Sequence, residues 1–280
     1  MATGKPPERS LMERRLVLMY HGVRPLSGGG FLEQALVVEP HAFAAQIGRL
    51  AAAGYRSLRV DDYAGGRWRE GFGRGVLLTF DDAYEGLEEY VSPVLRHFGY
   101  TAVVFAPVAH LGGFNTWDAR NRALSRLRIV DRDGLRALAD GPWEVASHGF
   151  RHVDLRQLDR PTRLGELVMS REAIAEIVGS APRALAYPFG HADKAVRADA
   201  VAAGFEIAFV ATPYATGDPL RMPRRAINNL DRALLFDIRM SPRPWLFRME
   251  DAARMIPRGY RRLRRIGQAA LRREPRGEIG

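Results

Sequence analysis

The feature that most constrains the fold of this chain is a regular alternation between short apolar segments and longer amphipathic segments with helical periodicity. Strands that alternate with helices form parallel β/α units, so we expect an α/β fold. Apolar segments of strand length occupy residues 16–20, 76–80, 101–108, 143–147, 183–188 and 205–211. Helical patterns occupy residues 40–53, 84–98, 161–178 and 192–203, with Pro93 expected to kink or divide the second.

Length and composition agree with one enzyme domain. A chain of 280 residues can bury a large core. Its 46% hydrophobic and 26% charged residues are ordinary for a globular protein. The absence of cysteine excludes disulfide bonds and a thiol nucleophile.

Two adjacent carboxylates, Asp81 and Asp82, follow the predicted strand at residues 76–80. Ending a buried strand in two carboxylates is costly unless a cation or hydrogen-bond donors neutralise them. Taken alone, such a pair is also typical of a turn or of a helix N-cap.

Two histidines, His148 and His152, follow the predicted strand at 143–147. Their spacing places both imidazoles on one face if the segment turns helically, although such a pair alone is also typical of a solvated helix. Strand carboxyl ends share one rim in α/β folds, so we expect both motifs to lie together. Two imidazoles and a carboxylate can hold a divalent metal, and the second carboxylate can act as a base. The pattern indicates a hydrolase centre.

The motifs resemble those of the polysaccharide deacetylases of carbohydrate esterase family 4. Residues 79–82 (Thr-Phe-Asp-Asp) resemble the first family motif, and residues 147–152 (Ser-His-Gly-Phe-Arg-His) resemble the second. Residues 186–190 resemble the Pro-aromatic-Gly motif of the active-site wall. The resemblance covers about residues 15–230 and implies a distorted (β/α)7 barrel. The activity it implies is the removal of N-acetyl groups from amino-sugar saccharides, either polysaccharides or lipid-linked oligosaccharides.

The resemblance also implies a role for each matching residue. Asp81 is the expected general base, and the backbone N–H near Phe189 is expected to hold the oxyanion, with Tyr187 in the same substrate wall. The implied cofactor is a divalent metal, with zinc expected first and cobalt, nickel or manganese as alternatives. Its expected ligands are Asp82, His148 and His152.

Two positions depart from the common family pattern. Ala186 stands where an Arg usually braces the base, and no histidine follows His191 to serve as the late general acid. A subgroup with permuted motifs, which includes biofilm exopolysaccharide deacetylases, supplies the acid from its first strand. His21 matches that position, and Arg224 is the candidate brace. The alternative to a catalytic His21 is a strand-end histidine bonded to backbone, and the alternative to a bracing Arg224 is a surface arginine.

Trp117 lies in the long loop before the second motif, where its ring could stack on a sugar or anchor the loop on the barrel. Trp117 and the Tyr20-His21 pair, which resembles the first motif of the permuted subgroup, favour a saccharide substrate. Three alternatives stay open at this point: another carbon–nitrogen amide hydrolase, for example on a cyclic ureide, an O-deacetylase, and a non-catalytic carbohydrate-binding protein.

We divide the chain into an arm (1–14), a catalytic domain (15–240) and a basic tail (241–280). Residues 252–280 contain nine Arg and two Glu, most of the net charge of +10. We interpret the tail first as solvated and partly disordered and second as a helix on an anionic membrane; nucleic-acid binding is the least expected. Residues 1–14 carry no secretory signal, so a cytoplasmic location, with membrane association as an alternative, is expected.

Overall fold

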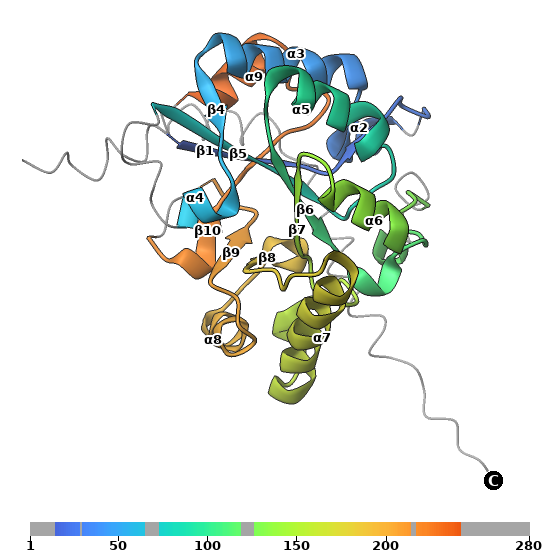
Figure 1. The fold of residues 1–280 in the computed structure, drawn as a ribbon, viewed down its shortest axis with the longest axis vertical. Helices are drawn as coiled ribbons and strands as arrows, with labels where there is room; N and C mark the ends of the chain where they lie inside the picture. Colours follow the sequence, from blue (N-terminus) through green and yellow to red (C-terminus); the bar gives the residue numbers. More distant parts are fainter. Residues whose placement is uncertain (1–14, 29, 65–72, 119–125, 214–216, 242–280) are drawn as a thin grey trace, which may run out of the picture. The chain divides into compact units, whose positions relative to one another are not determined.

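The computed structural model describes residues 15–28, 30–64, 73–118, 126–213 and 217–241 (Figure 1). The predicted arm at 1–14 and residues 242–280 of the predicted tail lie outside the described residues. The division of the chain into arm, catalytic domain and tail therefore stays a prediction.

The described strands form a nearly closed parallel barrel. The sheet order starts at β10, runs through β9, β8, β7, β6, β5 and β1, and ends at β11. β10 pairs with β9 and β11 pairs with β1, and only Arg224 separates β10 from β11. This short segment therefore closes the ring, which confirms the expected distorted (β/α)7 barrel. The strands of the ring are β1 (Arg15–Tyr20), β5 (Arg74–Asp81), β6 (Ala102–Ala106), β7 (Trp143–Ser147), β8 (Ala184–Ala186), β9 (Ile207–Val210), β10 (Met222–Pro223) and β11 (Arg225–Ala226).

Helices surround this ring and cover its outer face (Figure 1). The described α-helices are α2 (Gly30–Leu36), α3 (Pro40–Ala52), α4 (Val60–Ala64), α5 (Ser92–Phe98), α6 (Arg132–Ala139), α7 (Arg160–Val178), α8 (Lys194–Ala202) and α9 (Leu234–Met240). Three short strands complete the pattern: β4 (Tyr55–Ser57) pairs with β5, and β2 (Gly22–Val23) pairs with β3 (Val37–Val38). Among the described helices, none combines the length and the apolar character that a membrane crossing needs.

The predicted helix at 84–98 is divided in the structure. A π-helical turn, η2 (Leu87–Val91), begins after Gly86, whose φ of 99° lies in the left-handed region. α5 then starts at Ser92 with Pro93 in its first turn. Proline lacks an N–H and is tolerated only in the first turn of a helix, so it marks the start of a new helix.

Side chains alternate between the two faces of the barrel wall. Val60 and Tyr63 of α4 join the inward-facing cluster, and Glu144 of β7 accepts a hydrogen bond of 3.0 Å from the backbone N–H of Val60. α4 therefore closes the amino-terminal end of the barrel, and the opposite rim is left for polar groups. The inward cluster includes Val17, Leu77, Val103, Phe105, Ala146, Ala184, Ala186, Ile207 and Phe209.

Candidate active site

Asp81 and Asp82 lie where β5 ends at the open rim of the barrel. The alternation along β5 points Leu77, Thr79 and Asp81 to the interior. The chain then turns sharply, with φ of 71° at Asp82 and 50° at Ala83. Such left-handed conformations are strained for residues other than glycine and are retained mostly at functional sites. Both carboxylates are buried.

His148 and His152 reach the same point from the end of β7. The condition of a helical turn is not met, because residues 148–152 form a loop in which Gly149 has a φ of 77° and His152 a φ of 53°. This loop still brings both imidazoles to Asp82, whose Oδ1 lies 3.4 Å from His148 Nε2 and 3.3 Å from His152 Nε2. His148 Nδ1 lies 2.7 Å from the carbonyl oxygen of Ala186 and donates to it, which leaves Nε2 available as a ligand.

These three side chains fit a divalent metal. Their ligand atoms lie within 4.8 Å of one another, and Asp82 Oδ1 is a buried atom without a hydrogen-bond partner among the described residues. Metal–ligand bonds of about 2.0–2.2 Å place tetrahedral ligand atoms about 3.3–3.6 Å apart, close to both observed distances. Burial lowers the pKa of His148 to about 4, so its imidazole is neutral and can ligate. Burial acts to raise the pKa of Asp82, but the nearby histidines outweigh it and hold that pKa well below its usual range.

We predict that His148→Ala abolishes stoichiometric metal binding. Losing a group that only supports a ligand costs about 10–100-fold in metal affinity, so losing a ligand should cost more. The measurement is metal content after reloading with zinc or cobalt and dialysis. The exposed His97 provides the control, and His97→Ala should bind as much metal as the wild type. If the wild type holds no more metal than His148→Ala, the site assignment is wrong.

Arg224 pairs with Asp81 through two hydrogen bonds inside the barrel. Its Nη1 donates to Asp81 Oδ1 at 2.6 Å and its Nη2 donates to Oδ2 at 2.7 Å. The guanidinium is 1% exposed and lies over the rings of Phe105 and Phe209, 5.5 and 5.9 Å from their centroids. Burial acts to raise the pKa of Asp81, but Arg224, helped by His148, lowers it below its usual value. The alternative of a surface charge is excluded for Arg224, and its role in catalysis stays a prediction.

His21 follows β1 at the same rim. Tyr20 lies opposite Phe80 in the ladder between β1 and β5, so His21 and Asp81 are the next residues on two neighbouring strands. The charge of His21 contributes to lowering the pKa of both Asp81 and Asp82, which places the imidazole near both carboxylates. Its side chain is half-buried. The structure therefore brings together Asp81, Asp82, His148, His152, Arg224 and His21.

Two aromatic side chains hold His152 in place. Trp117 stacks on the imidazole with ring centroids 4.0 Å apart, and Phe189 meets it edge-on at 4.7 Å. One face of Trp117 is thus covered by a metal-ligand candidate, so sugar stacking on its other face stays a prediction. Phe189 has a φ of 61°, and Gly190 follows because a Cβ there would lie 2.2 Å from the Cβ of Ala211. This tight turn sets the backbone of the candidate oxyanion site.

Tyr187, expected in the substrate wall, does not turn its side chain towards the site. Tyr187 is fully buried on the outer side of the barrel wall, in a cluster that includes Leu155 and Phe205. Its hydroxyl donates to the carbonyl oxygen of Leu220 at 3.0 Å. Strand alternation gives the inward position to Ala186 instead, so Tyr187 shapes the wall through its backbone only.

One residue near the site, Tyr84, was missed by the sequence analysis. Tyr84 is 2% exposed, and its hydroxyl has no hydrogen-bond partner among the described residues. Burial, with Asp82 next, raises the pKa of this phenol. Burial and Asp82 also raise the pKa of Asp118, which accepts a hydrogen bond of 3.2 Å from the side chain of Asn115. The only signal for Tyr84 was its position two residues after Asp82.

Comparison with known protein families agrees with this site. The polysaccharide deacetylase family matches residues 70–208, which contain both the Asp motif and the His motif. Residues 70–208 therefore carry a polysaccharide deacetylase domain. None of the curated proteins matches the chain.

Solved structures show the same fold. The Streptococcus pyogenes deacetylase PplD, in complex with acetate, is 18% identical and has a TM-score of 0.67, with 81% of this chain and 98% of that chain covered. A de-N-acetylase from Aggregatibacter actinomycetemcomitans is 18% identical and has a TM-score of 0.66, with 80% of this chain and 99% of that chain covered. IcaB from Ammonifex degensii is 20% identical and has a TM-score of 0.65, with 81% of this chain and 97% of that chain covered. At these identities the likeness concerns the fold.

Proposed function

We propose that this chain is a metal-dependent hydrolase that removes N-acetyl groups from an amino-sugar-containing saccharide. The observation that carries the proposal is the Asp81–Arg224 pair directly beside the Asp82, His148 and His152 cluster. The match of residues 70–208 to the polysaccharide deacetylase family and the likeness to a de-N-acetylase support it. Zinc is the proposed metal, with cobalt, nickel or manganese able to replace it.

Asp81 is the proposed general base. Its Oδ2 lies 3.9 Å from His148 Nε2, so the carboxylate borders the metal-ligand cluster. Arg224 keeps Asp81 ionised and fixes its orientation, and the remaining lone pairs can accept a proton from the attacking water. When bound, a divalent ion supplies Lewis acidity that polarises the acetyl carbonyl and acidifies the water. The backbone N–H of Phe189 then stabilises the developing negative charge on the carbonyl oxygen.

His21 is the proposed general acid. An amide nitrogen leaves as a free amine only if it gains a proton as the C–N bond breaks. His21 ends β1 next to Asp81, so an acetamido group between them can lose its acyl part to water and its nitrogen can take the proton. The products are acetate and the free amine, and no covalent enzyme intermediate is required.

For His21→Ala we predict retained metal binding and a turnover roughly 10²–10⁴-fold lower on N-acetyl saccharides. An activated acetate ester should be nearly spared, because its leaving group departs without a proton. Steady-state rates on both substrates test the assignment. An equal loss on amide and ester would remove His21 from the mechanism.

Acetate release from a panel of N-acetylated and O-acetylated saccharides tests the proposed function. Free oligosaccharides and lipid-linked saccharides should both be included. We expect metal-dependent release from N-acetyl substrates. Release from O-acetyl substrates alone would overturn the N-deacetylase proposal.

Contact with an anionic membrane and a cytoplasmic location complete the proposal. Both rest on the sequence: the nine Arg of residues 252–280 support attraction to anionic lipid. A cytoplasmic enzyme at a membrane would meet lipid-linked saccharides, which is why the panel includes them.

A further inference from the structure

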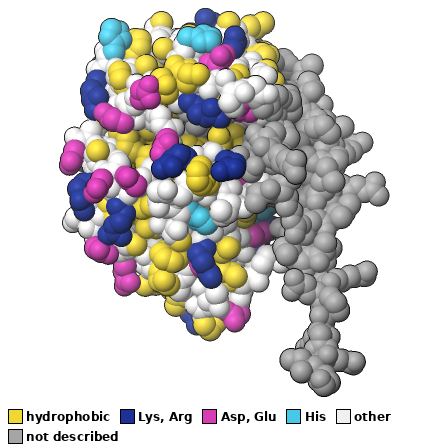
Figure 2. Space-filling model, turned by 90° about the vertical axis from the view of Figure 1, so that its right-hand side faces the viewer, with side chains coloured by type: hydrophobic (Ala, Val, Ile, Leu, Met, Phe, Trp, Pro, Cys, Tyr) yellow, Lys and Arg dark blue, Asp and Glu magenta, His cyan; other side chains and the backbone are white. Residues whose placement is uncertain are grey.

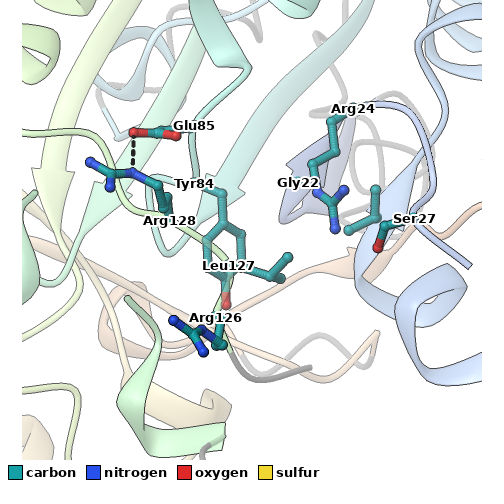
Figure 3. Close-up of a pocket in the computed structure, with 9 residues that line it drawn as sticks. Gly22, Arg24, Ser27, Tyr84, Glu85, Arg126, Leu127 and Arg128 are labelled. Carbon is teal, nitrogen blue, oxygen red and sulfur yellow. Dashed lines mark hydrogen bonds and ion pairs between the residues drawn. The ribbon is translucent and has the colours of Figure 1, made fainter. Parts of the chain in front are cut away.

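A pocket lined by polar and apolar residues opens beside the candidate active site. It has a volume of about 300 Å³, at the lower end of the range for small-molecule sites. Its wall includes Gly22, which directly follows His21, and Tyr84, which lies two residues after Asp82. Each of these lining residues therefore has its Cα atom within about 8 Å of the Cα atom of a candidate site residue. The lining residues are Gly22, Arg24, Ser27, Val37, Tyr84, Glu85, Arg126, Leu127 and Arg128 (Figure 3).

The charge of this pocket is predominantly positive. Three arginines and one glutamate line it, and Figure 3 shows Arg24 on one side and Arg126 and Arg128 on the other. By contrast, on the face shown in Figure 2 basic and acidic side chains are interspersed. The pocket is therefore a local concentration of cationic groups.

The arginines keep unused hydrogen-bond donors. Arg126 forms no ion pair with a residue that the structure describes, and its guanidinium lies 5.8 Å from the ring centroid of Phe114. Arg128 donates from Nε to Glu85 at 2.9 Å, which leaves its two terminal amino groups. Arg24 donates from Nη2 to the buried Glu33 at 2.6 Å and from Nη1 to the carbonyl oxygen of Pro25 at 3.0 Å, which fixes its direction, and a guanidinium with five N–H groups keeps others for a ligand.

This arrangement favours an oxyanion. Guanidinium groups bind carboxylates and phosphates through paired hydrogen bonds, and the three arginines outnumber Glu33 and Glu85, the two carboxylates that pair with them. Among the apolar lining residues, Val37 and Tyr84 are buried and form the floor, and the half-buried Leu127 offers the apolar surface that a sugar ring can contact. Gly22 packs closely on Val37 and Tyr84, since a Cβ there would lie 3.4 and 3.7 Å from their side chains.

We propose that this pocket is a subsite for an anionic group, a carboxylate or a phosphate, carried by the saccharide next to its N-acetyl group. The inference rests on the proposed function and narrows the substrate class to acidic or phosphorylated amino-sugar saccharides. The anion is bound by Arg126 and Arg128 on one side and by Arg24 on the other.

The test compares kcat/KM on three substrates: a neutral N-acetylglucosamine disaccharide, a disaccharide of N-acetylglucosamine and glucuronic acid, and N-acetylglucosamine 1-phosphate. We expect the wild type to prefer at least one anionic substrate about tenfold or more, as charge-assisted hydrogen bonds allow. Added NaCl should weaken the preference, because these groups are partly exposed. The two anionic arms decide between a uronic acid and a sugar phosphate.

Arg126→Gln should reduce the preference for the anionic substrate at least about fivefold relative to the neutral one. Arg132→Gln is the control, since Arg132 is exposed on α6 and pairs with Glu176 away from the pocket; it should leave the preference intact. Equal kcat/KM on neutral and anionic substrates, or an unchanged preference in Arg126→Gln, overturns the subsite.

A binding measurement keeps this inference separate from the proposed function. Inorganic phosphate and glucuronate are titrated into the wild type and Arg126→Gln, with the arginine side-chain NMR signals as the readout. Binding that weakens in the variant supports the subsite even if no substrate is deacetylated, in which case only the proposed function fails. Binding of neither anion by the wild type overturns the subsite even if neutral saccharides are deacetylated.

Discussion

Asp81→Asn is expected to keep its metal and to lose turnover by a factor near the upper end of the roughly 10²–10⁴-fold range for one proton-transfer group. The amide cannot take a proton from water, but its oxygen can still accept one hydrogen bond from Arg224. Folding should therefore survive, and unfolding curves measured alongside the rates check this. Metal content and acetate release are measured on the same preparation.

Asp82→Asn is the matched control for this prediction. Asp82 supplies the carboxylate that both histidines face, so its loss should weaken metal binding itself. The two adjacent carboxylates are thus expected to fail in different ways. Full activity in Asp81→Asn would contradict the assignment of Asp81 as general base and would favour attack of water on the acetyl carbonyl without a protein base.

Arg224→Met is expected to lower the free energy of unfolding by about 3–5 kcal/mol, because it leaves the buried Asp81 carboxylate without its partner. Arg224→Lys keeps the charge but not the paired geometry and should be less destabilising while still reducing turnover. Urea unfolding monitored by circular dichroism gives the stability of both variants.

Arg183→Met provides a matched comparison at the surface. Arg183 pairs with Asp61 and Glu206, but its side chain is 47% exposed. Exposed ion pairs contribute about 0–1 kcal/mol, so this change should be nearly neutral. If Arg224→Met were as stable as Arg183→Met, the buried pair would not have the importance that its geometry indicates.

Much of the barrel could be predicted from the sequence because its strands are buried on both faces. Such strands read as continuous apolar runs, and the glycines at 54, 179 and 204 mark where the predicted helices end. The structure places helices at Pro40–Ala52, Arg160–Val178 and Lys194–Ala202, within a few residues of the predicted ranges. The division of the helix at Pro93 was predicted and is confirmed, but the π-helical geometry of Leu87–Val91 was not predicted, because it has no strong local signature.

The arrangement of the site residues could be predicted from the sequence only in part. The spacing of His148 and His152 would place them on one face of a helix, but it is a loop with positive φ at Gly149 and His152 that brings them together. The pairing of Arg224 with Asp81 depends on closure of the barrel between β9 and β1, which joins residues 143 positions apart. Arg24, Arg126 and Arg128 share a pocket only through this long-range folding, and no motif links them.

Equal release of acetate and free amine from an N-acetylglucosamine oligosaccharide tests the central claim most directly. The protein is stripped of metal, reloaded with one zinc ion per chain and assayed in both states. The account predicts no release from the stripped protein and equimolar acetate and amine from the reloaded one. A protein that holds its zinc yet releases neither product from any N-acetylated saccharide would contradict the account.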